Sequence, residues 1–285
     1  MVKQDTDLGC QDARAVLHLL KPSFERFGRR GIFMDVGTNN GGVSAAIMKT
    51  FEPWSVGIPS SKVPMVCGDS IGRGHQAVKV IAYEPEANWF RVLQKQIERI
   101  HSRRESPASK VVAMQVAVSD VPGYQTLYSN GNADSAGSLY NAVGAQQNSW
   151  VQVISLGSQF LALNLPVHFL NIDAEGSDLA VLRGARQLLQ LGRIRFIVFE
   201  YGESWRRVEP KISFRVAVEY LFSFGYLCFL ITRFALIPLN GPLWDAFYES
   251  LEWANTFCSQ SENIFDVYVA YGTNNQTRHC AKLFL

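Results

Sequence analysis

Acidic residues follow several short apolar runs in this sequence of 285 residues. Four such segments are DVGTNNG (residues 35–41), Glu84-Pro85-Glu86, Ser119-Asp120 and Asp173-Ala174-Glu175-Gly176, and a fifth run ends at Glu200. A carboxylate in such a place can accept hydrogen bonds from ligand hydroxyls, attract a cation or accept a proton. Taken alone, each acid could equally be a helix N-terminal or turn residue. Because ligands of open α/β sheets bind beyond the carboxyl ends of the strands, we expect these acids to share one site.

The segments between these acids alternate between strand and helix patterns. Strands are predicted at residues 31–36, 78–83, 111–118, 151–154, 168–172, 194–200, 226–231 and 265–271, with a short added strand at 124–128. Helices are predicted at residues 13–27, 42–50, 87–100, 158–163, 177–191 and 214–224. This alternation favours an α/β fold with a doubly wound, mostly parallel sheet. Residues 1–30 are predicted to be an N-terminal helical extension of a single domain over residues 31–285, in which the Pro-, Gly- and Ser-rich residues 52–77 form a loop insertion.

Composition and charge argue against several classes of protein. The 27 basic and 25 acidic residues give a net charge of +2, which is too balanced to favour a nucleic acid or an anionic membrane as partner. The most apolar stretch, residues 220–238, is interrupted by Arg233 and is shorter than the ~20 apolar residues of a membrane span. The N-terminus lacks the basic flank and apolar run of a signal peptide. We therefore predict a soluble, cytoplasmic protein.

The cysteine and histidine residues are scattered along the chain. Five cysteines occur without a C-x-x-C motif, which favours reduced thiols in an intracellular compartment. The five histidines are equally dispersed, so a zinc site built from neighbouring ligands in the sequence is not expected.

The loop at residues 35–41 bears on the class of cofactor. A dinucleotide-binding loop has the pattern G-x-G-x-x-G and no side-chain charge beside the pyrophosphate. Here Asn39 replaces the second glycine, and Asp35 precedes Gly37 by two residues. A carboxylate there would repel a pyrophosphate but favour the ammonium and sulfonium groups of S-adenosylmethionine, whose methionyl part the glycines would let the backbone approach. An S-adenosylmethionine-dependent methyltransferase is therefore favoured, and a nicotinamide-dependent oxidoreductase stays open.

Glu84 follows the second predicted strand, where a carboxylate can accept hydrogen bonds from both hydroxyls of an adenosine ribose. Its distance from Gly37 exceeds the ~20 residues of the compact dinucleotide motif, and the insertion at residues 52–77 accounts for the excess. Nicotinamide enzymes use the same arrangement, so Glu84 indicates an adenosine ribose rather than a particular reaction.

Four motifs together resemble the FkbM family of methyltransferases. They are DVGTNNG, AYEPE, AVSDVPG and FLNIDAEGSDLAVLRGA. The resemblance implies that residues 31–285 form an FkbM-like domain of the class I (Rossmann-like) methyltransferase fold, a seven-stranded, mostly parallel sheet with an antiparallel C-terminal strand. It also implies S-adenosylmethionine as cofactor and, as methyl acceptor, an oxygen of a small molecule or glycan.

The resemblance further assigns roles to individual residues. By position, Asp35, Gly37, Asn39 and Gly41 would form the methionine-binding loop, Glu84 would bind the ribose, Ala117 and Val118 would lie beside the adenine with Asp120 nearby, and Asp173 and Glu175 would lie near the transferred methyl group. No residue is predicted to bind a metal ion.

Methyl transfer from a sulfonium is an in-line displacement, so alignment of the reactants supplies much of the acceleration. An alcohol acceptor also benefits from a base that removes its proton. Asp173 is the first candidate for this base and Glu175 the second, with Glu200 and His168 behind them. As alternatives, these acids could orient the cofactor or cap helices, or Asp173, Glu175 and Glu200 could bind Mg²⁺.

Three further questions stay open in the sequence. Asn171 stands where the FkbM family often has Lys and Gly157 where it often has Asp, so a non-catalytic member that binds the cofactor or a partner protein remains an alternative. Residues 129–148 could form a lid over the acceptor or a surface loop. The C-terminal aromatics from Trp205 to Phe257 could pack in the core or on a helix, line the acceptor site or form a dimer contact, and the oligomeric state is not predicted.

Overall fold

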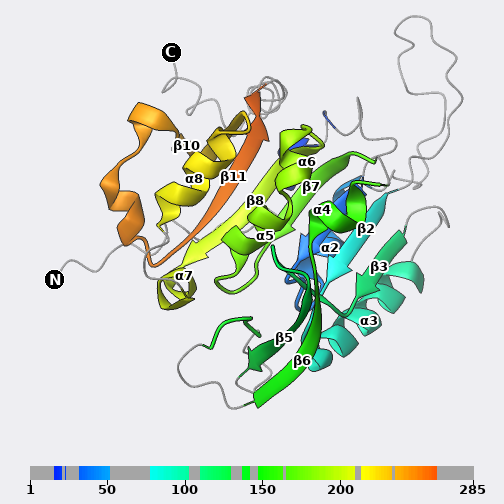
Figure 1. Cartoon of the computed structure of the whole chain (residues 1–285). Helices are drawn as coiled ribbons and strands as arrows, with labels where there is room; N and C mark the ends of the chain where they lie inside the picture. Colours follow the sequence, from blue (N-terminus) through cyan, green and yellow to red (C-terminus); the bar gives the residue numbers. More distant parts are fainter. Residues whose placement is uncertain are drawn as a thin grey trace, which may run out of the picture.

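The computed structural model of the chain (Figure 1) describes residues 16–20, 23, 32–51, 78–102, 110–129, 137–141, 147–162, 165–208, 213–232 and 235–261. Its strands are β1 (Ile32–Val36), β2 (Lys79–Tyr83), β3 (Lys110–Met114), β4 (Ala117–Val118), β5 (Gly123–Ser129), β6 (Gln147–Ile154), β7 (Val167–Ile172), β8 (Ile194–Gly202), β9 (Tyr226–Ile231), β10 (Leu236–Pro238) and β11 (Trp253–Gln260). Its α-helices are α2 (Gly42–Phe51), α3 (Ala87–Ser102), α4 (Leu156–Phe160), α5 (Asp178–Gly184), α6 (Arg186–Gln190), α7 (Glu203–Val208) and α8 (Phe214–Phe222), and its 3₁₀-helices are η3 (Leu17–Leu20), η5 (Gly241–Leu243) and η6 (Ala246–Ser250).

The main sheet has eight strands in the order β10-β9-β11-β8-β7-β1-β2-β3. The neighbours from β3 to β8 pair in parallel, so the carboxyl ends of these strands meet at one edge of the sheet. A second sheet of three strands, β4-β6-β5, extends from this edge of the body. The structure therefore has an α/β architecture with a large, mostly parallel sheet.

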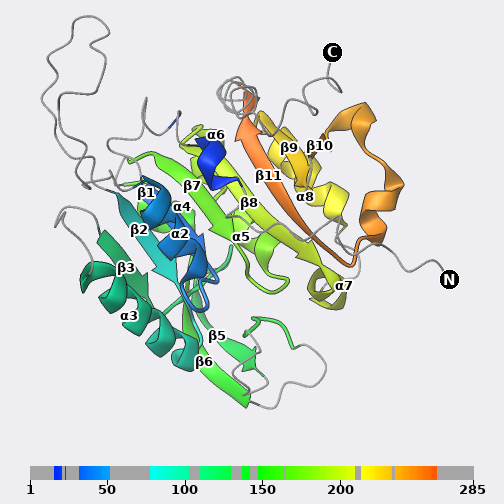
Figure 2. The same cartoon turned by 180° about the vertical axis from the view of Figure 1, so that it is seen from behind.

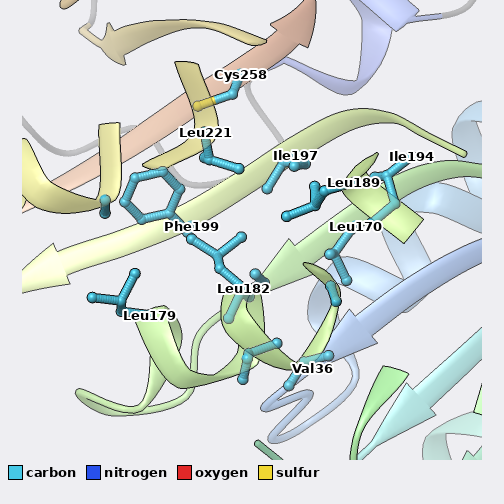
Figure 3. Packing of buried hydrophobic residues seen from close by; sticks show 14 of the residues in the cluster. Val36, Leu170, Leu179, Leu182, Leu189, Ile194, Ile197, Phe199, Leu221 and Cys258 are labelled. Carbon is cyan, nitrogen blue, oxygen red and sulfur yellow. The ribbon is translucent and has the colours of Figure 1, made fainter. Parts of the chain in front are cut away.

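Buried apolar side chains cover both faces of the main sheet, as expected for parallel strands enclosed by helices. Alternate residues of β1 face opposite sides, so that Met34 and Val36 belong to one core cluster and Phe33 to the other. Helices α4, α5, α6 and α8 cover the first face (Figure 1), and α2, α3 and η3 cover the second (Figure 2). Figure 3 shows the first cluster, in which Leu182 and Leu221 of two helices pack beside Phe199 of β8.

The main sheet differs from the seven strands implied by the family resemblance. In the described part of the chain it has eight, because β10 pairs antiparallel with β9 at the outer edge. Strand β11, which was not predicted, pairs antiparallel with both β8 and β9. It occupies residues 253–260, whereas the predicted strand at residues 265–271 lies outside the described residues.

The second sheet was not predicted as a separate unit. The single strand predicted at residues 111–118 is in fact two strands, β3 in the main sheet and β4 in the second. The strand predicted at residues 151–154 is the end of β6, which pairs with β4 and β5 rather than within the main sheet. The short added strand predicted at residues 124–128 is confirmed as β5.

Several helix predictions need correction. The helix predicted at residues 177–191 is divided into α5 and α6 at Ala185. Of the C-terminal aromatic residues, Phe247 and Tyr248 lie on the short 3₁₀-helix η6, and Trp244 directly follows η5. The predicted insertion at residues 52–77, and residues 1–15 of the predicted N-terminal extension, lie outside the described residues.

The prediction of reduced thiols is wrong for one pair of cysteines. Cys228 of β9 and Cys258 of β11 form a disulfide bond. They are direct partners across the antiparallel strand pair, and both are completely buried. The sequence could not reveal this pairing because it depends on the register of two strands separated by 30 residues. Among the described helices, none is long and apolar enough to cross a membrane.

Candidate functional site

The turn after β1 is packed tightly against the end of β7. Gly37 adopts a left-handed backbone conformation with φ of 73°, and a Cβ atom there would lie 1.7 Å from the carbonyl oxygen of Asp173. The amides of Gly37 and Thr38 both donate to the carbonyl oxygen of Tyr83, at 3.0 and 3.1 Å. Only glycine fits this position, since any side chain would meet backbone atoms.

Asp35 lies beneath this turn and is completely buried. Its two carboxylate oxygens accept hydrogen bonds from Ser44 Oγ at 2.6 Å and from Asn171 Nδ2 at 2.9 Å. Burial raises the pKa of Asp35, and these hydrogen bonds oppose the increase. Asp35 was predicted to face the methionyl group, but in the structure it supports the turn from below and does not line the pocket described next.

Glu84 forms a second side of the site, at the end of β2. Its Oε2 accepts from the Asn39 amide at 2.8 Å and its Oε1 from the Glu86 amide at 2.9 Å, so the carboxylate is fixed in orientation. Burial raises the pKa of Glu84 to about 7, although both backbone hydrogen bonds act in the opposite direction. Each oxygen retains a lone pair that could accept a hydrogen bond from a ligand hydroxyl.

The loop after β7 holds Asp173 and Glu175. Glu175 has a left-handed backbone with φ of 49°, and Gly176 follows with φ of 93°. The buried carboxylate of Asp178 accepts from the amides of Ala174 and Gly176, at 3.4 and 3.3 Å, which fixes the loop from beneath. A left-handed residue other than glycine costs on the order of 1–2 kcal/mol, so the conformation of Glu175 indicates a loop held by its surroundings.

Carboxyl groups crowd together at this loop. Burial, followed by the neighbouring charges of Glu200 and Glu175, raises the pKa of Asp173 well above its ordinary value. Burial likewise raises the pKa of Glu200 to about 7, an effect that a hydrogen bond from the Trp253 side chain opposes. Burial also raises the pKa of Asp178 to about 7 and that of Glu175 above its ordinary value. Raised pKa values in a cleft are typical of functional carboxyl groups.

One pocket joins these elements. Its lining residues are Val36, Gly37, Asn39, Tyr83, Glu84, Pro85, Val116, Ala117, Val118, Leu127, Gly137, Leu139, Asp173, Ala174, Glu175 and Ser177. They border about 530 Å³ of empty space, a figure that includes open solvent. Among these residues none is Lys, Arg or His. The predicted residues Gly37, Asn39, Glu84, Ala117, Val118, Asp173 and Glu175 thus come together as expected.

Other candidates lie elsewhere. Gly41 does not line the pocket; it turns the chain into α2, and a Cβ there would lie 2.9 Å from Leu93. Asp120 is exposed and accepts only a local hydrogen bond from Ser119 Oγ, at 3.2 Å. His168 is buried between aromatic rings, including those of Phe33 and Phe196, on the second face of the sheet. Among the described residues, no group of three or more His, Cys, Asp or Glu is arranged to hold a metal ion.

The chemistry of the pocket fits S-adenosylmethionine. Three of its residues carry buried polar atoms that have no protein partner, namely Asn39 Oδ1, Tyr83 Oη and Ser177 Oγ. A buried polar group without a partner is costly, so these atoms indicate a polar ligand. Glu84 offers acceptors for ribose hydroxyls, the acids offer negative charge for the ammonium and sulfonium, and Val116, Ala117 and Val118 offer an apolar surface for the adenine.

Sequence reasoning missed several of these residues. Tyr83 directly precedes Glu84, and Ser177 directly follows the D-A-E-G motif, so proximity to predicted site residues was an available signal. Gly137 and Leu139 belong to residues 129–148, which carry no motif and for which the sequence left a lid and a surface loop open. They reach the pocket because Ser138, which lies between them, pairs with Tyr128 of β5.

Comparison with known proteins supports the assignment of the family. Residues 35–228 match the family model described as the methyltransferase FkbM domain. The chain belongs to this family. The match covers the turn after β1, Glu84 and the loop after β7, and it extends to Cys228 in β9.

Solved structures similar to this FkbM-family chain include methyltransferases. One is a methyltransferase FkbM from Methylobacillus flagellatus KT, with 14% sequence identity and a TM-score of 0.44, covering 81% of this chain and 44% of that one. Another is precorrin-6y C5,15-methyltransferase from Geobacter metallireducens GS-15, with 10% identity and a TM-score of 0.41, covering 86% of each chain. The present chain thus spans less than half of the Methylobacillus protein. No curated protein matches the sequence.

Proposed function

We propose that this FkbM-family protein is an S-adenosylmethionine-dependent methyltransferase that methylates a hydroxyl group of a small molecule or glycan. The observation that carries the proposal is the single pocket in which the turn at Gly37, the fixed carboxylate of Glu84 and the acids of the loop after β7 meet. The unpartnered polar atoms of Asn39, Tyr83 and Ser177 support a polar ligand in this pocket.

Glu84 would receive the two ribose hydroxyls, and the backbone at Gly37 would approach the methionyl part, which a side chain there would exclude. S-adenosylmethionine supplies a methyl group activated by a positively charged sulfur. Leu127 and Leu139 would provide an apolar wall on one side of the pocket that excludes water. Holding the acceptor in line with the methyl group is then the main task of the protein.

Asp173 is the proposed base. Its raised pKa makes its carboxylate a stronger proton acceptor than an ordinary aspartate. In its ionised form it would take the proton of the acceptor hydroxyl as the new C–O bond forms. The charges of Glu200 and Glu175 lie close enough to raise the pKa of Asp173 further.

Calorimetric titration with S-adenosylmethionine and S-adenosylhomocysteine tests the cofactor. We expect micromolar binding by the wild type, its loss in Glu84→Ala, and no change in Glu98→Ala, a matched control on the exposed side of α3. Absence of binding by folded wild-type protein would refute the proposal. Transfer of a labelled methyl group to hydroxyl, amine and carboxyl compounds then tests the acceptor, with Asp173→Asn expected to abolish transfer while retaining cofactor binding.

A further inference from the structure

A short segment on the second sheet forms one wall of the pocket. We call residues 137–141 the lid segment. The Tyr128 and Ser138 backbones exchange two hydrogen bonds, each of 2.9 Å, so that the lid segment joins the edge of β5. Gly137 permits this approach, since a Cβ atom there would lie 2.9 Å from the Leu127 side chain. Gly137 and Leu139 line the pocket beside Leu127.

The Ser138 side chain connects this wall to the acidic loop. Ser138 is buried, and its hydroxyl donates to the carbonyl oxygen of Glu175 at 3.0 Å while accepting from the Tyr140 amide at 3.2 Å. Donor and acceptor are 37 residues apart in sequence. The hydroxyl therefore joins the lid segment to the loop after β7, two sides of the pocket.

The acceptor of this bond is the residue with the unfavourable backbone conformation. Glu175 is left-handed, and its neighbours Ala174 and Gly176 are held from beneath by Asp178. Ser138 holds the Glu175 carbonyl from the side of the second sheet. With both attachments in place, the Glu175 side chain is kept at the pocket, where it is one of the lining residues.

We propose that Ser138 is a positioning residue that fixes Glu175 and closes the lid segment over a bound ligand. The proposal rests on the proposed function, because the ligand is taken to be the S-adenosyl cofactor. A ligand in contact with both walls is released more slowly while the Ser138–Glu175 hydrogen bond is intact. The hydroxyl, rather than the size of the side chain, is the property that matters.

Surface plasmon resonance with S-adenosylhomocysteine tests this role. S-adenosylhomocysteine should dissociate about fivefold faster from the Ser138→Ala variant than from the wild type, with little change in its association rate. A factor of about five corresponds to one hydrogen bond of ordinary net strength. Ser138→Thr, which retains the hydroxyl, should restore slow dissociation. Ser149→Ala, an exposed serine of β6, is the matched control. A purely structural role would lower thermal stability without separating Ala from Thr in the dissociation rate.

The outcomes separate the two proposals. Absence of S-adenosylhomocysteine binding by the wild type overturns the proposed function, whereas binding with an unchanged dissociation rate in Ser138→Ala overturns the role of Ser138 alone. If Ser138→Ala does not fold, amide hydrogen exchange of the wild type decides. The Ser138 and Tyr128 amides should exchange more slowly with S-adenosylhomocysteine bound, and unchanged exchange would refute closure of the lid segment.

Discussion

The carboxyl group of Glu84 should make cofactor binding depend on pH in the physiological range. Burial raises its pKa to about 7 in the ligand-free protein. Hydroxyl groups donate hydrogen bonds to an ionised carboxylate more strongly than to a neutral acid, so the ligand should bind the ionised form. Binding then lowers the pKa of Glu84 and releases a proton wherever the free carboxyl group is protonated.

The magnitude follows from the pKa. With a pKa of about 7, roughly one molecule in eleven carries ionised Glu84 at pH 6 and about ten in eleven at pH 8. The dissociation constant of S-adenosylhomocysteine should therefore be about tenfold larger at pH 6 than at pH 8, a free-energy difference of about 1.4 kcal/mol. The raised pKa of Glu84 also makes folding stability depend on pH, but in the opposite direction to ligand affinity. Because it is raised above the unfolded value, the contribution of Glu84 to stability is complete below about pH 4.5 and is lost as the pH rises through about 7.

Calorimetric titration at pH 6, 7 and 8 in buffers of different ionisation enthalpy measures both the affinity and the protons released. The wild type should release nearly one proton at pH 6 and almost none at pH 8. Glu84→Gln should bind more weakly at pH 8, and its affinity should depend less on pH over this range than that of the wild type. Wild-type affinity that stays constant from pH 6 to pH 8 would refute the reasoning. A tenfold dependence that persists in Glu84→Gln would instead assign the titration to the acids around Asp173.

Three further predictions concern the framework of the site. Gly37→Ala should abolish S-adenosylhomocysteine binding in calorimetry, because its Cβ would lie 1.7 Å from a backbone oxygen. Gly225 has a similar positive φ but no atom within 4 Å of the position that a Cβ would occupy. As the control, Gly225→Ala should bind the ligand normally and lose only ~1–2 kcal/mol of folding stability. Asn171→Ala leaves one oxygen of buried Asp35 without its partner and should lower the free energy of urea unfolding by about 1–3 kcal/mol; an unchanged midpoint would contradict this. Reduction of the Cys228–Cys258 disulfide should lower the unfolding free energy by about 3–4 kcal/mol, the loop entropy expected for a sequence separation of 30 residues. Equal unfolding curves with and without reductant would show that the bond contributes nothing.

The parallel pairing of the strands could be predicted because short apolar runs bounded by polar turns alternate with helix patterns along the chain. Once the strands pair in parallel, their carboxyl ends must lie at one edge. Glu84 and Asp173, separated by almost ninety residues, therefore meet without any signal between them. The common pocket is the consequence of sheet topology, and the sequence contains that topology in its alternation of strand and helix patterns.

The second sheet shows where sequence patterns become ambiguous. Residues 111–118 are apolar except for Gln115, and this single polar residue does not reveal that β3 ends and β4 joins a different sheet. The same limit applies to Asp35, whose position two residues before Gly37 suggested that it contacts the ligand. Its actual partners, Ser44 and Asn171, are known only when β1 lies beside β7. Asn171, a departure from the common family pattern, is thereby explained as the strand partner that holds Asp35.

The concentration of acids also explains why a cationic cofactor suits this site. Asp173, Glu175 and Glu200 repel one another when ionised, and burial weakens their hydration further. Among the described residues that line the pocket, no basic side chain compensates this charge. A sulfonium and an ammonium group bound beside these acids would supply the missing positive charge and favour the ionised form of Asp173. Under the proposed function, cofactor binding thus does more than deliver the methyl group: it prepares Asp173 to accept a proton, and an acceptor that bears its own negative charge would be repelled.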